Sequence, residues 1–230
     1  MMSTIAFPEF TPGAFQALLH EHGYVYLDRI PDGFDHTGFC REMVGELMPQ
    51  YDGKLEYLIR AEEEFQHLSH SLTTNPLKPH SDGYEFTGPP PRHIALWCLF
   101  PPADSGGRTT LCDVYRFLDT LSAEERQTLA QRCYRFVSGI EDTSVVRSAS
   151  HPMIEERAGS PPIVRFSIDF VEADSFLRDI NQRLLSYDEH HHVAVAFETN
   201  ALLVFDNLRM VHGRTGYQDR RRQLRRIWLR

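Results

Sequence analysis

The sequence predicts a mainly β protein with flanking helices, of the β-sandwich or jelly-roll class. Three observations lead to this prediction: many short strand-like segments in the middle and end of the chain, few helical segments, and no regular alternation of the two. A doubly wound parallel sheet would need that alternation, because a crossover helix joins its strands. With 230 residues and 41% hydrophobic content, the chain can bury one sizeable core. We therefore expect a single domain, residues 1–230.

Local signals at their ends define the expected helices. Thr11 and Pro12 suit an N-cap and a first helical residue, and Gly23 suits the stop. Ser122 and Glu125 form a capping box ahead of an apolar position. The predicted helices cover about residues 12–22, 35–48, 123–132 and 173–186.

Apolar runs and two-residue alternation define the expected strands. Segment 94–100 is almost continuously apolar, which is typical of a strand covered on both faces, and segment 163–170 shows the clearest alternation. Between strands, the polar passage 62–77 has no periodicity, so it either covers a site or simply connects. The predicted strands are 24–27, 55–60, 94–100, 108–113, 134–138, 153–156, 163–170, 193–197 and 201–206.

Charge and composition bound the possible partners. The formal net charge is −8, whereas a general nucleic-acid or membrane-surface binder would carry a basic excess. The N-terminus has no basic and apolar leader pattern, and no stretch reaches 18 apolar residues. We expect a cytoplasmic protein without nucleic-acid or membrane partners, of undetermined oligomeric state. The four cysteines lack the short paired spacing of zinc or redox motifs, and three of them lie in apolar or strand-like contexts, so buried free thiols are expected.

Two segments far apart in the sequence contain residues that suit a metal centre. His80 and Asp82 are two residues apart, so on an extended strand their side chains point to the same side. With 12 His and 32 acidic residues, such a pair is a weak signal alone. Its context strengthens it, because Pro79 and Gly83 punctuate the end of a strand.

A third ligand comes from the other end of the chain. His212 follows the apolar run 201–206, which a turn signal closes at Asp206-Asn207. Two imidazoles and one carboxylate on one face of an ion leave the opposite face open, an arrangement that suits non-haem Fe(II) in oxygenases. The tract His190-His191-His192 also looks metal-binding, but it lies in a polar region just before a strand, so we expect it to be a loop.

Three motifs resemble one enzyme family. The segment FDNLRMVHGRTGY followed by RRRQLRR resembles the C-terminal signature of the TauD/TfdA-like branch of Fe(II)/2-oxoglutarate-dependent oxygenases, which includes clavaminate synthase-like and gamma-butyrobetaine hydroxylase-like members. PHSDGYEF resembles the proximal His-x-Asp motif of this family, and SGGRTT resembles its Gly-Gly-x-Thr segment. The motifs occur in the family's order, from residue 80 to the C-terminus.

The resemblance implies a fold, a metal and a cosubstrate. The fold would be a double-stranded β-helix, a cupin-like jelly roll, with Fe(II) held by His80, Asp82 and His212 as the catalytic centre. 2-Oxoglutarate and O2 would bind the iron, and the reaction would release succinate and CO2. Hydroxylation of an unactivated C–H bond is the default outcome, although desaturation or cyclisation use the same type of site.

The resemblance also implies residues that bind 2-oxoglutarate. Thr109 matches the threonine of the Gly-Gly-x-Thr segment, and the arginine that grips the far carboxylate is Arg222 or Arg226, ten and fourteen residues after His212. From the residues alone, alternation after Arg222 places Arg226 among apolar neighbours. A buried guanidinium needs an anionic partner, and a carboxylate can supply one through two parallel hydrogen bonds. The sequence does not choose between the two arginines.

The sequence constrains the identity of the substrate less than it constrains the metal site. Tyr84, Glu85 and Phe86 follow the metal turn and Arg214 follows the distal histidine, so these four residues are candidates for substrate contact. A small polar, amino-acid-like metabolite is the expected substrate. Two alternatives stay open: a metal-binding jelly roll without oxygenase turnover, and an anion- or nucleic-acid-binding module that uses the six arginines among the last twelve residues.

Overall fold

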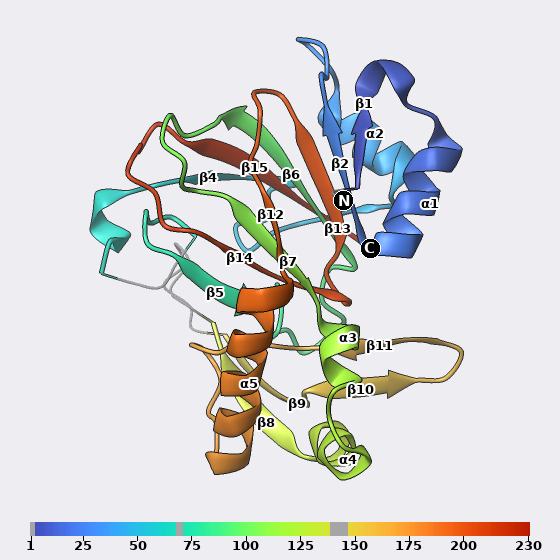
Figure 1. Ribbon diagram of the computed structural model, residues 1–230, viewed down its shortest axis with the longest axis vertical. Helices are drawn as coiled ribbons and strands as arrows, with labels where there is room; N and C mark the ends of the chain where they lie inside the picture. The colour runs from blue at the N-terminus through green and yellow to red at the C-terminus, as the bar shows by residue number, and fades with distance from the viewer. Residues whose placement is uncertain (1–2, 68–70, 139–146) are drawn as a thin grey trace.

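Two facing β-sheets form the centre of the molecule (Figure 1). The computed structural model describes residues 3–67, 71–138 and 147–230. The larger sheet contains, in spatial order, β1 (Thr4–Ala6), β2 (Tyr24–Asp28), β13 (Leu202–Asp206), β6 (His93–Phe100), β15 (Gln223–Leu229) and β3 (Leu47–Met48), and β4 (Glu56–Arg60) also pairs with β15. The smaller sheet contains β12 (Val193–Val195), β7 (Thr109–Asp113), β14 (Met210–Arg214) and β5 (Leu77–His80). This architecture confirms the predicted mainly β jelly roll.

Strand pairing between the early and late parts of the chain brings the metal motifs together. β5 and β14 are antiparallel neighbours, and His80 and His212 are register partners. β14 also pairs with β7, which carries Thr109. On the other sheet, the C-terminal strand β15 lies between β6 on one side and β4 and β3 on the other. The long sequence separation between the two histidines is therefore closed by a single strand pair.

The cores on either side of the sheets explain where the helices lie. Between the sheets, residues such as Leu96, Leu203 and Trp228 pack against Leu111 of the smaller sheet. The outer face of the larger sheet is covered by α1 (Pro12–His22) and α2 (His36–Met43). The outer face of the smaller sheet packs against α3 (Val114–Leu118), α4 (Ala123–Gln131) and α5 (Ser175–His191), together with the hairpins β8–β9 (Cys133–Val137, Ser148–Pro152) and β10–β11 (Ile154–Arg157, Ser160–Val164). Single-turn helices cover Phe7–Glu9 (η1) and Glu63–Phe65 (η2).

The predicted helix boundaries are confirmed where capping chemistry defines them. The Thr11 hydroxyl accepts a hydrogen bond from the Ala14 amide, and α1 ends at Gly23, which has a φ of 77°. Ser122 and Glu125 make both hydrogen bonds of a capping box at the start of α4. Along the described parts of the chain, no helix has the length and apolar composition that a membrane span requires.

The helix predicted over residues 35–48 is too long, because α2 ends at Met43. A Cβ at Gly45 would lie 2.5 Å from the backbone oxygen of Arg230, so the chain passes too close to the C-terminus for a side chain there. Leu47 then enters β3 and pairs with Leu229. Strand pairing with the end of the chain has overridden the helical spacing of the apolar residues.

Two further predictions are corrected by tertiary contacts. The strand predicted at 163–170 ends at Val164, and Ser167 instead forms an isolated bridge with His80. The His190-His191-His192 tract was expected in a loop, but α5 continues through His191. The Nδ1 atom of each of the three histidines lies 2.7–2.9 Å from the carbonyl oxygen four residues earlier. The imidazoles thus fold back over the last turn of the helix, and the Asp188 carbonyl also accepts the His192 amide at 3.0 Å.

The burial of the cysteines generates a test of the fold. Burial raises the pKa of Cys40, Cys98 and Cys112 to about 12, so these thiols stay protonated at pH 8, whereas Cys133 is exposed. Because the thiolate is the nucleophile, we expect one rapidly reacting thiol in the native protein and four after denaturation. Titration with Ellman's reagent at pH 8 measures this. Cys133→Ser should remove the rapid phase, and two or more rapid thiols in the native protein would contradict the packing.

Candidate metal centre

Three potential metal ligands converge at the end of β5 and on the neighbouring strand. The ligand atoms of His80, Asp82 and His212 all lie within 4.8 Å of one another. This is the only such group of three or more potential ligands in the parts of the chain that the structure describes, so the tract at residues 190–192 does not form a second one. The predicted metal-ligand residues are therefore brought together.

The orientation of the side chains fits a shared ion. The Oδ1 atom of Asp82 lies 3.7 Å from His80 Nε2 and 3.6 Å from His212 Nε2, too far for hydrogen bonds. The Nδ1 atom of His80 lies 2.9 Å from the carbonyl of Lys78, so Nδ1 carries the proton and Nε2 keeps its lone pair for a ligand. Such outer hydrogen bonds fix the tautomer of metal-binding histidines.

The second oxygen of the Asp82 carboxylate is held from the opposite sheet. Oδ2 accepts hydrogen bonds from Arg226 Nη1 at 3.0 Å and from Trp228 Nε1 at 2.9 Å, and both residues lie on β15. The guanidinium of Arg226 donates through Nε to Gln50 Oε1 at 2.9 Å, while Gln50 Nε2 donates to the Arg226 carbonyl. The carboxylate is thus oriented with only Oδ1 directed toward the histidines.

Burial and charge give these ligands the protonation states that metals require. Burial of Asp82 opposes its ionisation, but Arg226 and the neighbouring histidines reverse this effect and lower its pKa to about 2. Burial, followed by the proximity of His80, lowers the pKa of His212 to about 3. At neutral pH the site therefore presents a carboxylate and a neutral imidazole, the forms that bind metals.

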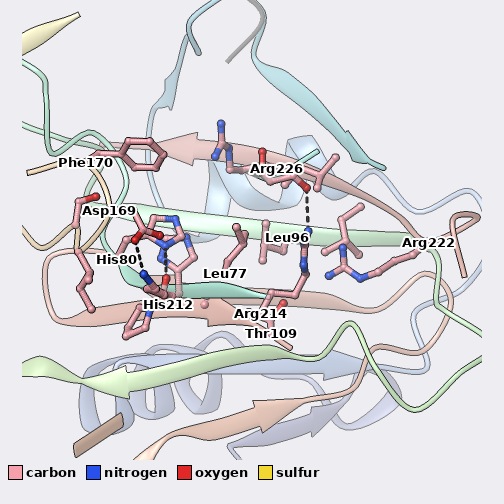
Figure 2. A pocket seen from close by; sticks show the side chains of 18 residues that line it. Leu77, His80, Leu96, Thr109, Asp169, Phe170, His212, Arg214, Arg222 and Arg226 are labelled. Atoms are coloured by element: carbon pink, nitrogen blue, oxygen red, sulfur yellow. Dashed lines mark hydrogen bonds and ion pairs between the residues drawn. The ribbon is translucent and has the colours of Figure 1, made fainter. Parts of the chain in front are cut away.

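A cavity extends from the two histidines between the sheets (Figure 2). At the metal end it is lined by Lys78, Asp169 and Phe170, and Lys78 forms an ion pair with Asp169. At the other end Figure 2 shows Arg222. Thr109, at the start of β7, also lines the cavity and is 3% exposed. No sequence pattern singles out Lys78 or Asp169, since both are ordinary charged residues in short segments.

Arg222 is a buried cation whose hydrogen-bonding capacity is only partly used. It is 2% exposed, and its Nε donates to the carbonyl of Gly107 at 3.0 Å. Its buried Nη1 makes no hydrogen bond to any residue of the described ranges, and burial lowers its pKa. A Cβ at Gly107, which has a φ of 65°, would lie 2.9 Å from Arg222 Cδ, so this glycine makes room for the guanidinium. Such a buried cation favours an anion in the cavity.

Three of the four residues predicted to contact the substrate pack against other parts of the fold. Tyr84 stacks on Phe170 and Phe86 packs against Trp228, while Glu85 is 2% exposed. None of these three lines the cavity, because the chain turns away after the metal carboxylate, so direct contact with substrate is not expected of them.

Arg214, the fourth candidate, does line the cavity. Its guanidinium, however, donates to the carbonyls of Ser71, Thr73 and Asn75 at 2.6–2.9 Å. It thereby holds the segment that precedes β5 against the strand that carries His212.

The C-terminal arginines do not form a free basic patch. Arg222 and Arg226 are buried in the cavity wall and beside the metal site. Each of the other four has an acidic partner: Arg220 with Glu63, Arg221 with Asp219, Arg225 with Glu56 and Arg230 with Glu46. The six arginines therefore divide into two buried side chains and four that lie beside acidic neighbours.

A jelly roll with two histidines and one carboxylate at one end of a cavity defines the class of facial-triad metalloproteins. The chain belongs to the taurine catabolism dioxygenase TauD, TfdA family, whose model matches residues 7–228. The family expected from the sequence is confirmed, and with it the enzyme class, a dioxygenase. No curated protein sequence matches the chain.

Several solved structures share the fold. An asparagine oxygenase in complex with Fe(II), hydroxyasparagine and succinate has a TM-score of 0.79 at 16% identity, covering 95% of this chain and 78% of that one. PvcB, an Fe, alpha-ketoglutarate dependent oxygenase from an isonitrile synthetic pathway, has a TM-score of 0.68 at 24% identity, covering 98% and 82%; it has also been solved as the Pseudomonas aeruginosa protein. OrfP, a non-heme iron oxygenase in complex with Fe and alpha-ketoglutaric acid, has a TM-score of 0.69 at 18% identity, covering 96% and 81%.

The carboxylate at the centre of the site gives a direct test of metal binding. Asp82→Ala removes the anionic ligand beside two imidazoles, so Fe(II) affinity under anaerobic conditions should fall at least about tenfold, since even outer-shell changes have effects of that size. Asp169→Ala removes the other cavity carboxylate and should leave the affinity within about twofold. Fluorescence or calorimetric titration measures both, and equal affinities for wild type and Asp82→Ala would show that Asp82 is not a ligand.

Proposed function

We propose that this protein is an Fe(II)- and 2-oxoglutarate-dependent oxygenase that hydroxylates a small amino-acid-like molecule at an unactivated C–H bond. The observation that carries the proposal is a single cavity lined at one end by the two triad histidines, with Asp82 beside them, and at the other end by the buried cation Arg222. A metal-binding jelly roll without turnover would need only the triad. An oxygenase of this kind needs both.

The triad would supply three donor atoms to Fe(II). His80, Asp82 and His212 would hold Fe(II), and Asp82 would bind through Oδ1, because Oδ2 is occupied by Arg226 and Trp228. The iron with 2-oxoglutarate and O2 supplies the oxidising chemistry, in which one oxygen atom enters the substrate and the other enters succinate as CO2 is released. The protein contributes orientation, charge and exclusion of water.

Of the two candidate arginines, Arg222 is the better anchor for the far carboxylate of 2-oxoglutarate. Arg226 already donates to Asp82 and lies beside the metal site, whereas Arg222 is at the distant end of the cavity with a buried Nη1 to offer. An arginine can bind a carboxylate through two parallel hydrogen bonds. Thr109 on β7 would add its hydroxyl, as a neutral donor on the cavity wall.

The metal end of the cavity is suited to a small zwitterion. Lys78 and Asp169 form an ion pair there, so the wall offers one charge of each sign, and Phe170 adds an apolar surface. An amino acid carries the complementary ammonium and carboxylate groups. Two of the structural neighbours, the asparagine oxygenase and OrfP, were solved with hydroxylated amino acids, which supports the same class of substrate here.

The role of Arg222 can be tested by substitution. Arg222→Met removes the cation at similar length, so the 2-oxoglutarate concentration for half-saturation should rise about 10- to 150-fold, as expected for a lost hydrogen bond to a charged group. Arg225→Met, three residues along, is the matched control, because Arg225 pairs with Glu56 and is 41% exposed. It should change the requirement less than about twofold. An unchanged requirement in Arg222→Met would refute the anchoring role.

The activity itself is tested by product formation. Purified protein with Fe(II), ascorbate and 2-oxoglutarate should release succinate in a substrate-dependent manner when a panel of L-amino acids is screened, with a mass increase of one oxygen atom in the active substrate. Omitting Fe(II) or O2 should abolish both signals. If the protein binds Fe(II) and 2-oxoglutarate but releases no succinate with any small metabolite, the alternative of a metal-binding jelly roll without oxygenase turnover is favoured.

A further inference from the structure

The turn between β13 and β14 places a buried carboxamide against the backbone of the metal carboxylate. Asn207 is 1% exposed. Its Oδ1 accepts a hydrogen bond from the Asp82 amide at 2.8 Å, and its Nδ2 donates to the Asp82 carbonyl at 3.0 Å and to the Pro91 carbonyl at 2.8 Å. One side chain thus satisfies both backbone polar groups of Asp82. The sequence indicated only a turn at this position.

The turn that carries Asn207 is itself fixed. The Asn207 amide donates to the Arg92 carbonyl at 2.8 Å, and the Asp206 amide donates to the Gly23 carbonyl at 2.8 Å. From this turn the chain runs directly into β14, where His212 lies five residues further on. Asn207 therefore connects the backbone at Asp82 to the segment that positions the distal histidine.

Asp82 needs such a connection, because it lies outside regular strand pairing. β5 ends at His80, and the Ser81 amide donates to the Phe166 carbonyl, so no sheet hydrogen bond fixes the next residue. The Asp82 carboxylate is held by Arg226 and Trp228 through Oδ2 alone. Without a second restraint on its backbone, the carboxylate could pivot about that oxygen and carry Oδ1 away from the histidines.

We propose that Asn207 is a positioning residue of the metal centre, whose carboxamide sets the place of Asp82 Oδ1 relative to His212. The inference rests on the proposed metal-binding function of the triad. Asn207 contacts the backbone of one ligand and not the metal, so its effect is transmitted through Asp82. Residues that orient metal ligands from outside typically change metal affinity 10- to 100-fold when they are replaced.

A second asparagine offers a closely matched control. Asn200 accepts a hydrogen bond from Trp97 Nε1 at 3.1 Å and donates to the carbonyls of Ile30 and Pro31, so its carboxamide makes the same pattern of one accepted and two donated bonds. None of these partners belongs to the triad. Asn200 also has a φ of 66°, so replacing it by Ala adds backbone strain to the lost hydrogen bonds.

The experiment compares Asn207→Ala with Asn200→Ala in the intact, metal-free protein. Co(II) is titrated anaerobically at 10 °C without 2-oxoglutarate, followed by its visible ligand-field absorption, and thermal unfolding is recorded for each variant. We expect Co(II) affinity to fall about 10- to 100-fold in Asn207→Ala, with an altered absorption spectrum at saturation. Asn200→Ala should keep the wild-type affinity and spectrum, although its melting temperature falls at least as much.

The outcomes separate the inference from the proposed function. If wild type binds Co(II) but Asn207→Ala binds it with the same affinity and spectrum, the positioning role is wrong and the metal centre stands. If the two asparagine variants lose affinity equally, the effect is a general loss of stability and the inference is also wrong. A wild-type protein that binds no Co(II) overturns the metal centre and this inference together. Should Asn207→Ala fail to fold, Asn207→Ser is titrated in its place against the same expectations.

Discussion

The buried pairing of Asp82 with Arg226 is the interaction on which the rest of the site depends. Asp82 is 6% exposed and Arg226 4%, so each charge would be costly to bury without the other. Their contact joins the turn after β5 in the smaller sheet to β15 in the larger one. It therefore links the two sheets at the metal end of the cavity. It also keeps Asp82 ionised and ready for a cation.

Two arginines near the C-terminus, Arg222 just before β15 and Arg226 within it, lie in different surroundings. Arg222 and Arg226 have the same parity and are four residues apart, which corresponds to about 13 Å of extended chain. One lies beside the metal ligands and is neutralised by Asp82, whereas the other is buried near Tyr217 at the opposite end of the cavity. The cavity therefore has one cation beside the triad and a second at its far end. Trp228 continues the same face and supplies the second donor to Asp82.

Local sequence is sufficient to place an element whose ends are set by contacts within a few residues. Capping residues define α1 and α4 correctly, because their causes are hydrogen bonds within a few residues. The predicted helix at 35–48 and the predicted strand at 163–170 were both too long. In each case the residues pair with a distant segment instead. Leu229 pairs with Leu47, and His80 forms a bridge with Ser167. The periodicity of a segment does not reveal which distant segment will pair with it.

The sequence by itself determined the kinds of ligand, the family and the face of β15 on which Arg226 lies, since these depend on residue identity and on local alternation. Only the tertiary structure decided that Arg226 pairs with Asp82, that Arg222 keeps a buried donor for the cavity, and that Asn207 restrains the metal turn. All three depend on contacts between segments more than a hundred residues apart in the chain, or on burial that those contacts create. The environment of a charged or amide group is set by its spatial neighbours, and these become known only when the strands are paired.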